Sequence, residues 1–465
     1  MKFYSKQLIV FLIGFTINYS LVGCNGFLDL QPPATQPSTA EVFSSDEKAE
    51  TAVADLYGGE FPRSFAEASS YTAGLYADEL DYTLTSTALL EFKVSSLLPD
   101  NTYITNQFWA NIYKQIYNCN IIMENLQTSP GISEVAKNQY RGEALFFRAL
   151  SHFTLTNAFG AIPLITVTDY RTNSTIPRTD TATVLNQVIA DLEEAKSLLG
   201  EEYPHGTHIR ANKWAVKALS ARVYQSRQEW QKAYDASSEV IQSGLYGPLP
   251  APESAFLDPS PESILQIGPN KTTATSNPEA VYFIPTTSTR VPSYSVRTGL
   301  LEAFEPGDLR YNAWMNNQTI DGITYYYPAK YKSRTAALPK EDVILLRLAE
   351  MYLIRAEAAV HLGNVNEAIS DVDIIRSRAG LPHIADTEPN IGSNEMLEKI
   401  YQERRIELCF EHGFRWYDLK RTGKADDILS ELKPTTWKST GILYPIPESQ
   451  LLANPFLEPN PGYYK

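Results

Sequence analysis

The chain has 465 residues, of which 43% are hydrophobic and 20% are charged, so it can bury a large core and is not disordered as a whole. It has 40 Lys and Arg residues and 54 Asp and Glu residues, which gives a formal net charge of −14. A chain without a positive excess is a poor partner for nucleic-acid phosphates. Three cysteines are too few for a disulfide scaffold, whereas 28 Tyr, 19 Phe and 6 Trp make the chain rich in aromatic side chains.

The N-terminus has the pattern of a secretory signal. Two lysines within residues 1–6 precede an apolar stretch at residues 8–23, which is too short and too interrupted to span a membrane. The stretch ends Leu21-Val22-Gly23-Cys24, which resembles a bacterial lipobox, where the cysteine thiol takes a diacylglycerol. We predict a signal peptide at residues 1–23 and a lipidated, palmitate-bearing Cys24 that anchors the protein to a membrane. The alternative is an ordinary secretory signal with an incidental cysteine.

Residues 24–43 are expected to form an extended leader between the anchor and the body, because Pro32, Pro33 and Pro37 lie within them. Residues 44–465 are expected to form a single domain. Its first helix should begin at Ser44, whose spacing to Glu47 is that of a capping box, and should end at residues 57–58.

Apolar residues then recur every three or four positions, which predicts amphipathic helices over residues 104–246 and 341–421. Residues 214–241 and 345–372 each have the pattern of a helix, a tight turn and a second helix, with small alanines where the helices cross. This resembles tetratricopeptide repeats. The predicted fold class is therefore mostly α, with a TPR-like helical-repeat scaffold. Further helices are expected at 393–411 and 414–421.

Two segments, residues 61–103 and 247–338, lack this periodicity and are expected to be loop-rich and poor in β-structure. Nine prolines between positions 248 and 292 break any long helix in the second segment. A strand-like piece at 263–267 and a short helix at 298–304 are expected there. Both segments carry many aromatic residues, and long loops of this kind inside a domain are usually functional.

Six sequence motifs, taken in order along the chain, resemble the SusD/RagB-type surface lipoproteins of Bacteroidetes. They are Phe27-Leu28-Asp29, Arg141 to Ala149, Phe159 to Leu164, Leu348 to Leu353 with Arg355 to Ala358, Glu403 to Leu408 with Arg415 to Arg421, and the tail residues Tyr444 to Pro447 with Asn454-Pro455. The resemblance covers nearly the whole chain after Cys24.

The resemblance implies a nutrient-binding lipoprotein on the outer face of the outer membrane. Such proteins bind a glycan, or in some relatives a peptide, and pass it to a SusC-like TonB-dependent β-barrel transporter. They have no catalytic residues and need no cofactor. In that family the loops outside the TPR-like helices form the ligand face, and the TPR-like face packs toward the transporter. A cargo-free TPR-like scaffold is a further alternative.

The aromatic loop segments fit a glycan site, because sugar rings lie flat on aromatic faces while polar side chains bind their hydroxyls. For each candidate residue, local packing is the alternative interpretation. The candidate platforms are Tyr82, Phe92, Tyr282, Tyr294, Trp314, Tyr325 and Tyr326, and the candidate polar partners are Asp78, Asp81, Arg290 and Arg297.

A cluster of Arg and Glu side chains follows in the C-terminal motif. Glu403, Arg404, Arg405, Glu407 and Glu411 lie within three helical turns, at spacings that allow ion pairs, which favours a structural role. Trp416 is expected to pack on the helix before it.

Three rival interpretations deserve a test. Asp78, Glu79 and Asp81 could supply paired carboxylates for glycoside hydrolysis, and His205 with His208 could begin a metal site, but neither pattern is specific and no metal site is predicted. Cys119 and Cys409 lie in apolar helical patterns, which favours two buried free thiols over a disulfide.

Overall fold

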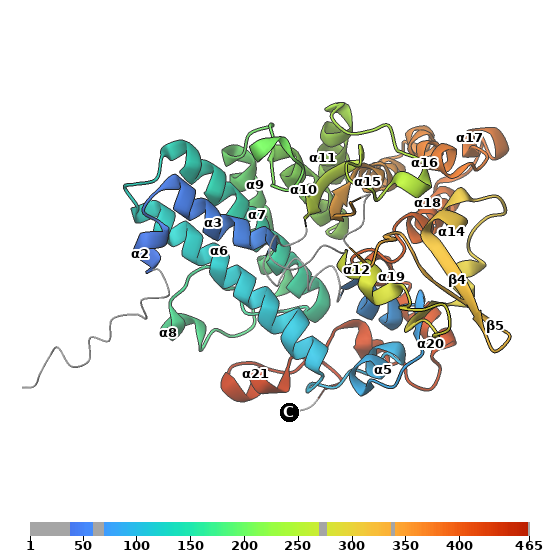
Figure 1. The fold of residues 1–465 in the computed structure, drawn as a ribbon, viewed down its shortest axis with the longest axis horizontal. Helices are drawn as coiled ribbons and strands as arrows, with labels where there is room; N and C mark the ends of the chain where they lie inside the picture. The colour runs from blue at the N-terminus through green and yellow to red at the C-terminus, as the bar shows by residue number, and fades with distance from the viewer. Residues whose placement is uncertain (1–37, 59–68, 269–276, 336–339, 464–465) are drawn as a thin grey trace, which may run out of the picture.

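The computed structural model describes residues 38–58, 69–268, 277–335 and 340–463 (Figure 1). The predicted signal peptide and Cys24 lie outside the described residues. Helices dominate the described chain, as predicted, and the strands are short. Within these residues, no helix combines the length and the apolar character that a membrane span requires.

The N-terminal half is built on a long central helix, α7 (Glu134–Phe159). Its N-cap is Ser133, whose side chain accepts from Ala136 N, and Gly160 ends it with a positive φ of 72°. Most of α7 is buried because α6 and α9 pack along it and α3 covers its first half. The other elements here are α2 (Thr39–Val42), α3 (Asp46–Gly58), a helix at 69–76, β1 (Leu80–Tyr82), α5 (Thr87–Lys93), the π-helix Ile104–Ala110, α6 (Asn111–Thr128), α8 (Tyr170–Asn173) and α9 (Thr181–Leu198).

Four of these elements differ from the sequence expectation. The helices at 69–76 and α5 lie in the segment expected to be loop-rich, and α2 lies at the end of the leader expected to be extended. Helix α3 begins at Asp46 rather than at Ser44, whose hydroxyl donates to Glu41 O instead.

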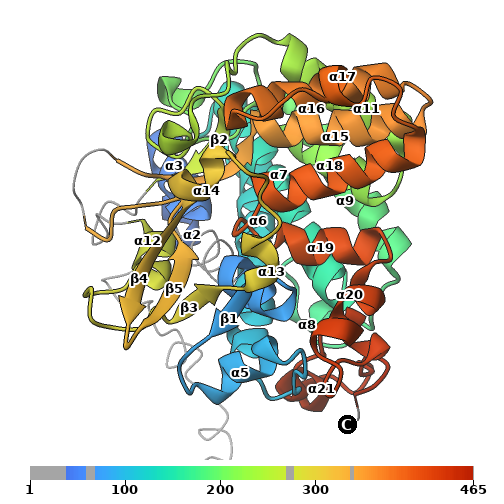
Figure 2. The ribbon, with the colours of Figure 1, turned by 90° about the vertical axis from the view of Figure 1, so that its right-hand side faces the viewer.

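The two predicted helix pairs are α10 (Lys213–Ser226) with α11 (Trp230–Gln242), and α15 (Leu348–His361) with α16 (Val365–Ala379). Helix α11 packs on α15, so the pairs stack on one another and continue the row from α7 and α9. Buried alanines at the crossings, such as Ala218, Ala233, Ala356 and Ala368, let the helices approach closely. Figure 2 shows this stack at the upper right, with the strands β1, β3, β4 and β5 on the opposite side.

Residues 343–347 form a strand, which corrects the expectation of a helix from residue 341. This strand, β6 (Val343–Arg347), pairs antiparallel with β2 (Ser263–Ile267), the one strand that the sequence predicted, with Ile267 opposite Val343. All of its side chains are buried. A short run of buried apolar residues has no periodicity that separates a strand from a helix, and only the partner strand decides.

The second loop-rich segment holds short elements: α12 (Pro278–Phe283), β3 (Tyr294–Val296), α13 (Thr298–Leu301), α14 (Leu309–Trp314), β4 (Met315–Ile320) and β5 (Ile323–Pro328). The predicted helix at 298–304 is present but ends at Leu301. The C-terminal part holds α17 (Ile384–Thr387), α18 (Ser393–Glu407), α19 (Phe414–Arg421), α20 (Ala425–Leu432) and α21 (Glu448–Ala453).

Helix α18 ends four residues earlier than predicted. Phe410, His412 and Gly413 all have positive φ angles, a backbone conformation that cannot continue a helix. Trp416 then turns into the core and is fully buried. Its ring neighbours are Tyr76 at 4.8 Å, Trp437 at 6.1 Å and Tyr444 at 6.3 Å, which come from other segments rather than from the preceding helix.

The predicted Arg and Glu cluster is structural, but its partners are distant in sequence. Glu407 is buried and pairs with Arg347 at 2.6 Å, with Arg310 at 3.0 Å and with Arg378. Burial opposes its charge, but these guanidinium groups outweigh that effect and hold the pKa of Glu407 well below its usual range. Glu411 likewise accepts from Lys330 at 2.6 Å and from Arg347. The cluster thus joins the end of α18 and the residues after it to β6, α14, α16 and the segment after β5.

Cys119 and Cys409 are both buried and both free, as the sequence favoured. Burial raises the pKa of each thiol, to about 12 for Cys409, so neither has the thiolate character of a reactive cysteine.

Candidate functional site

The two aromatic loop segments meet through a pair of strands that lie more than 200 positions apart in sequence. β1 and β3 run antiparallel, with Leu80 opposite Val296 and Tyr82 opposite Tyr294. Strand β5 of the neighbouring hairpin lies against β3. Figure 2 shows β1, β3, β4 and β5 together at the lower left. The structure therefore gathers parts of both segments on one side of the molecule, away from the stacked helix pairs.

A group of tyrosine rings fills the junction. Tyr71 lies at its centre, 5.1 Å from the ring of Tyr282 and 5.0 Å from that of Tyr294, and Tyr82 lies 5.5 Å from Tyr294. Tyr71, Tyr82 and Tyr294 are buried, whereas Tyr282 on α12 is 37% exposed. Since the buried ring of Tyr71 packs against it, Tyr282 is supported on one side and exposes part of its ring to solvent.

Tyr325 and Tyr326 lie on the hairpin β4–β5, opposite Gln318 and Asn317. Both are half-buried. Successive side chains of a strand point to opposite faces, so a ligand that lies along one face of the hairpin contacts only one of the two rings. Tyr326 packs at 5.9 Å against Tyr311. The side-chain amide of Gln318 donates to Arg290 O, which ties the hairpin to the loop before β3.

Three of the candidate polar side chains reach solvent. Asp81 forms an ion pair of 2.7 Å with Lys93, and both side chains are about one-third exposed. Arg297 is half-buried and donates through Nε to Leu80 O at 2.8 Å, and Arg290 is exposed. We call this set the tyrosine surface: it consists of Asp81, Lys93, Tyr103, Tyr282, Arg290 and Arg297, with Tyr325 and Tyr326 on the two faces of the adjoining hairpin.

Four of the predicted platforms are buried side chains instead. Trp314 is fully buried, its indole N–H donates to Pro252 O at 2.9 Å, and its ring faces Lys330 Nζ at 4.2 Å. Phe92 is also fully buried, with Phe108 and Tyr444 as ring neighbours. Neither ring can lie against a sugar in this structure. Tyr82 and Tyr294 are buried as well and pack against each other, so they do not offer a platform to a sugar.

Asp78 is a structural anchor rather than a ligand partner. It is buried and accepts from Arg415 at 2.7 and 2.8 Å and from Arg405 at 3.0 Å. Burial raises the pKa of a carboxyl, but the two arginines outweigh it and hold the pKa of Asp78 below its usual value. Glu79 is buried as well and accepts from Phe410 N at 3.3 Å. The acidic residues considered for hydrolysis are therefore not exposed together.

Tyr103 and Lys93 belong to the tyrosine surface but were not predicted. Tyr103 lies 6.1 Å from Tyr71 and 6.3 Å from Phe92, at the start of a helical segment. Tyr103 lies at the end of the first aromatic loop segment, so its position in the sequence could have identified it as a candidate. Lys93 carries no sequence signal, because its pairing with Asp81 depends on how α5 packs beside β1.

His205 and His208 do not point to a common ion. His205 Nε2 lies 2.6 Å from Glu50 Oε1, and His208 stacks on Tyr203 at 4.3 Å. Among the described residues, no group of three or more His, Cys, Asp and Glu side chains is placed to hold a metal.

Comparisons with known families agree with this architecture. A family model described as "Starch-binding associating with outer membrane" matches residues 26–225, and one described as "SusD family" matches residues 304–463. The first covers the N-terminal helices and β1. The second covers the hairpin, the α15–α16 pair and the buried Arg and Glu cluster.

Curated relatives and solved structures extend the match to the whole chain. SusD-like protein P38 of Formosa agariphila is 26% identical, with 100% of both chains covered. The starch-binding protein SusD of Bacteroides thetaiotaomicron is 31% identical over 155 residues, 31% of this chain and 26% of SusD. A SusD superfamily structure from Bacteroides vulgatus has a TM-score of 0.79 at 21% identity, covering 90% of this chain and 99% of that one. The chain belongs to the SusD/RagB family.

Proposed function

We propose that the protein captures a glycan at the tyrosine surface. The observation that carries this proposal is the exposed ring of Tyr282, which packs on the buried ring of Tyr71, itself in contact with the buried Tyr294. The apolar face of a sugar ring fits an aromatic platform, and its hydroxyls fit Asp81, Arg290 and Arg297. In this proposal the protein acts as a binding protein and not as an enzyme, so the glycan is passed on without chemical change.

We further propose that the protein is a lipoprotein of the outer membrane, anchored through Cys24 and facing the exterior. There it passes its cargo to a SusC-like TonB-dependent transporter. Membership of the SusD/RagB family and the lipobox-like residues 21–24 support this assignment. A structural neighbour described as a laminarin-binding SusD-like protein, with a TM-score of 0.73 at 23% identity over 90% of this chain and 100% of that one, also favours a glycan cargo.

The direct test is binding of the chain from residue 25 onward to laminarin, starch, other polysaccharides and a peptide mixture, by calorimetry. We expect saturable binding to one glycan class. Tyr282→Ala should weaken it about five- to 150-fold, because stacking on an aromatic side chain contributes on the order of 1–3 kcal/mol. Tyr170→Ala is the matched control, since Tyr170 is 80% exposed on α8, in another part of the fold.

Three outcomes would contradict the glycan proposal. Binding of peptides alone would move the protein to the peptide-binding alternative within the same family. Unchanged glycan binding by Tyr282→Ala would remove the tyrosine surface as the site. Release of shorter sugars from a bound glycan would make the protein an enzyme.

The anchor has its own test. Cells expressing the full chain are labelled with radioactive palmitate, and Cys24→Ala should abolish the label and release the protein from the membrane fraction. Retention of both in the variant would overturn the lipoprotein assignment.

A further inference from the structure

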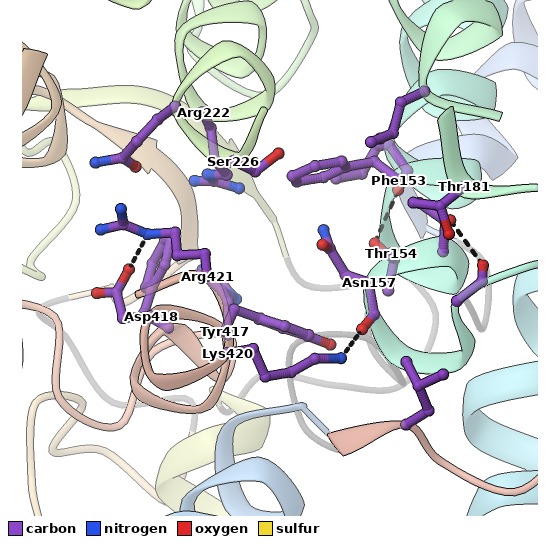
Figure 3. Close-up of a pocket in the computed structure, with 18 of the residues that line it drawn as sticks. Phe153, Thr154, Asn157, Thr181, Arg222, Ser226, Tyr417, Asp418, Lys420 and Arg421 are labelled. Carbon is purple, nitrogen blue, oxygen red and sulfur yellow. Dashed lines mark hydrogen bonds and ion pairs between the residues drawn. The ribbon is translucent and has the colours of Figure 1, made fainter. Parts of the chain in front are cut away.

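A second candidate site lies among the helices rather than on the tyrosine surface. A pocket of about 310 Å³ lies where α7, α9, α10 and α19 meet (Figure 3). Its apolar wall includes Leu150, Phe153, Leu185, Phe414 and Leu443. A pocket of this size is at the lower end of the range for sites that bind small organic molecules.

The opposite wall carries hydrogen-bond donors that have no acceptor among the described residues. Tyr417 Oη is buried and has no hydrogen-bond partner there. Arg404 donates to Asp418 through Nε at 2.9 Å and through Nη2 at 3.1 Å, but its Nη1 is buried and also lacks a partner. Buried polar groups in folded proteins are almost always hydrogen-bonded, so two such donors beside one pocket call for an explanation.

Lys420 adds a third donor, one helical turn after Tyr417. Figure 3 shows both side chains directed toward α7, where Lys420 Nζ donates to Asn157 O. An ammonium has three N–H bonds, and this bond uses one of them. The residue is half-buried, and desolvation lowers the pKa of Lys420 to about 7. A negative charge placed beside Nζ would favour its protonated form.

The other charged groups of the pocket are already paired. Arg222 binds Glu350 at 2.7 Å through two nitrogens, and Arg421 binds both Glu357 and Asp418. Tyr417 Oη, Arg404 Nη1 and Lys420 Nζ remain as donors. Four cations and one carboxylate line the pocket, and with Glu350 and Glu357 counted the group keeps an excess of one positive charge. The complement of such a wall is an acceptor that carries a negative charge.

We propose that this pocket binds a small carboxylic acid with an apolar body. Its carboxylate accepts from Tyr417 Oη, Arg404 Nη1 and Lys420 Nζ, and its apolar part lies against Leu150, Phe153 and Leu185. The site goes beyond the glycan function and does not depend on it, because none of its residues belongs to the tyrosine surface.

The test uses benzoate as probe and benzyl alcohol as its neutral counterpart, with binding followed by calorimetry and ligand-observed NMR. Benzoate should saturate one site and benzyl alcohol should bind at least about tenfold more weakly, because a hydrogen bond to a charged group is worth roughly that factor or more. Tyr417→Phe keeps the ring and removes one donor, so benzoate affinity should fall about tenfold.

A second variant keeps the proposal testable if Tyr417→Phe alters the fold. Thr181 is exposed at the start of α9 and lines the pocket, so Thr181→Trp should block benzoate without disturbing the core. Tyr401→Phe is the control, since Tyr401 packs near Arg421 but does not line the pocket. Equal binding of benzoate and benzyl alcohol, no saturable benzoate site, or unchanged benzoate binding by both pocket variants would overturn the proposal.

Discussion

Asp78 and Arg415 form a bidentate ion pair with oxygen–nitrogen distances of 2.7 and 2.8 Å, although they lie 337 positions apart in the chain. Asp78 stands two residues before β1, and Arg415 stands in the first turn of α19. The pair therefore fixes the base of the tyrosine surface to the C-terminal helices. The Arg and Trp motif that resembles the SusD/RagB family positions the proposed ligand surface without touching it.

Breaking this pair should be costly. Arg415→Ala leaves Asp78 buried with only Arg405 as partner, and removing one member of a buried pair typically costs about 3–5 kcal/mol. We expect a loss of this size in the free energy of unfolding, measured by urea denaturation. The control is Lys196→Ala, which removes a partly exposed pair with Glu193 and should cost less than about 1 kcal/mol. Equal losses in both variants would contradict the anchoring role of Asp78.

Glu79 should make stability fall as the pH rises. Burial and the charge of Asp78 raise the pKa of Glu79 from an ordinary 4.5 to about 7. Between these values the folded state binds more protons than the unfolded state, so the free energy of unfolding decreases from pH 4.5 to pH 7 and the loss is complete above pH 7. The full effect is on the order of 3 kcal/mol.

Glu79→Gln removes this titration and keeps an acceptor for Phe410 N. The variant should therefore gain stability relative to the natural protein as the pH is raised from 5 to 8, measured by urea denaturation at each pH. Comparing the variant with the natural protein at each pH cancels the contribution of other titrating groups. One of them is His152, whose pKa is lowered by burial to about 3. Glu134 is exposed, so Glu134→Gln serves as the control. Its difference from the natural protein in free energy of unfolding should stay almost constant between pH 5 and pH 8. A constant difference for Glu79→Gln as well would contradict the assignment.

Alanine variants of two glycines can separate the cost of backbone strain from the cost of steric crowding. Gly413 and Gly423 have nearly the same positive φ, 73° and 71°. A Cβ at Gly413 would lie 2.7 Å from Ala73 Cβ, whereas one at Gly423 would meet nothing within 4 Å. Both alanine variants should lose about 1–2 kcal/mol to the left-handed backbone. Gly413→Ala should lose about 1–3 kcal/mol more to overpacking, and equal melting temperatures of the two variants would refute this.

Trp314 and Tyr326 test the division between core and surface. Trp314→Ala empties a buried site and should cost about 3–5 kcal/mol of unfolding free energy. Tyr326→Ala should cost clearly less, because its ring is half-buried on the hairpin. If Tyr326 faces the glycan, its variant loses affinity at nearly natural stability. A stability loss for Tyr326→Ala as large as that for Trp314→Ala would place Tyr326 in the core.

Much of the helical scaffold could be predicted from the sequence. The period of apolar residues predicts a helix where α7 lies, and the bounds of α19 agree with the predicted 414–421. These features are local, since capping and periodicity depend on residues within a few turns. The family resemblance came from the same kind of contiguous pattern.

The tertiary structure alone decided which aromatic residues face solvent and which acids have partners. Trp314 and Tyr282 lie in similar aromatic, proline-broken sequence, yet one is fully buried and the other is exposed. Val343–Arg347 is a strand because β2 lies beside it, and Glu407 is ionised because three arginines from other segments surround it. Exposure, strand pairing and buried charge depend on contacts between distant residues, whereas helix formation depends on neighbours along the chain. The sequence therefore determined the scaffold and its family, and the packing of the two loop segments determined the site.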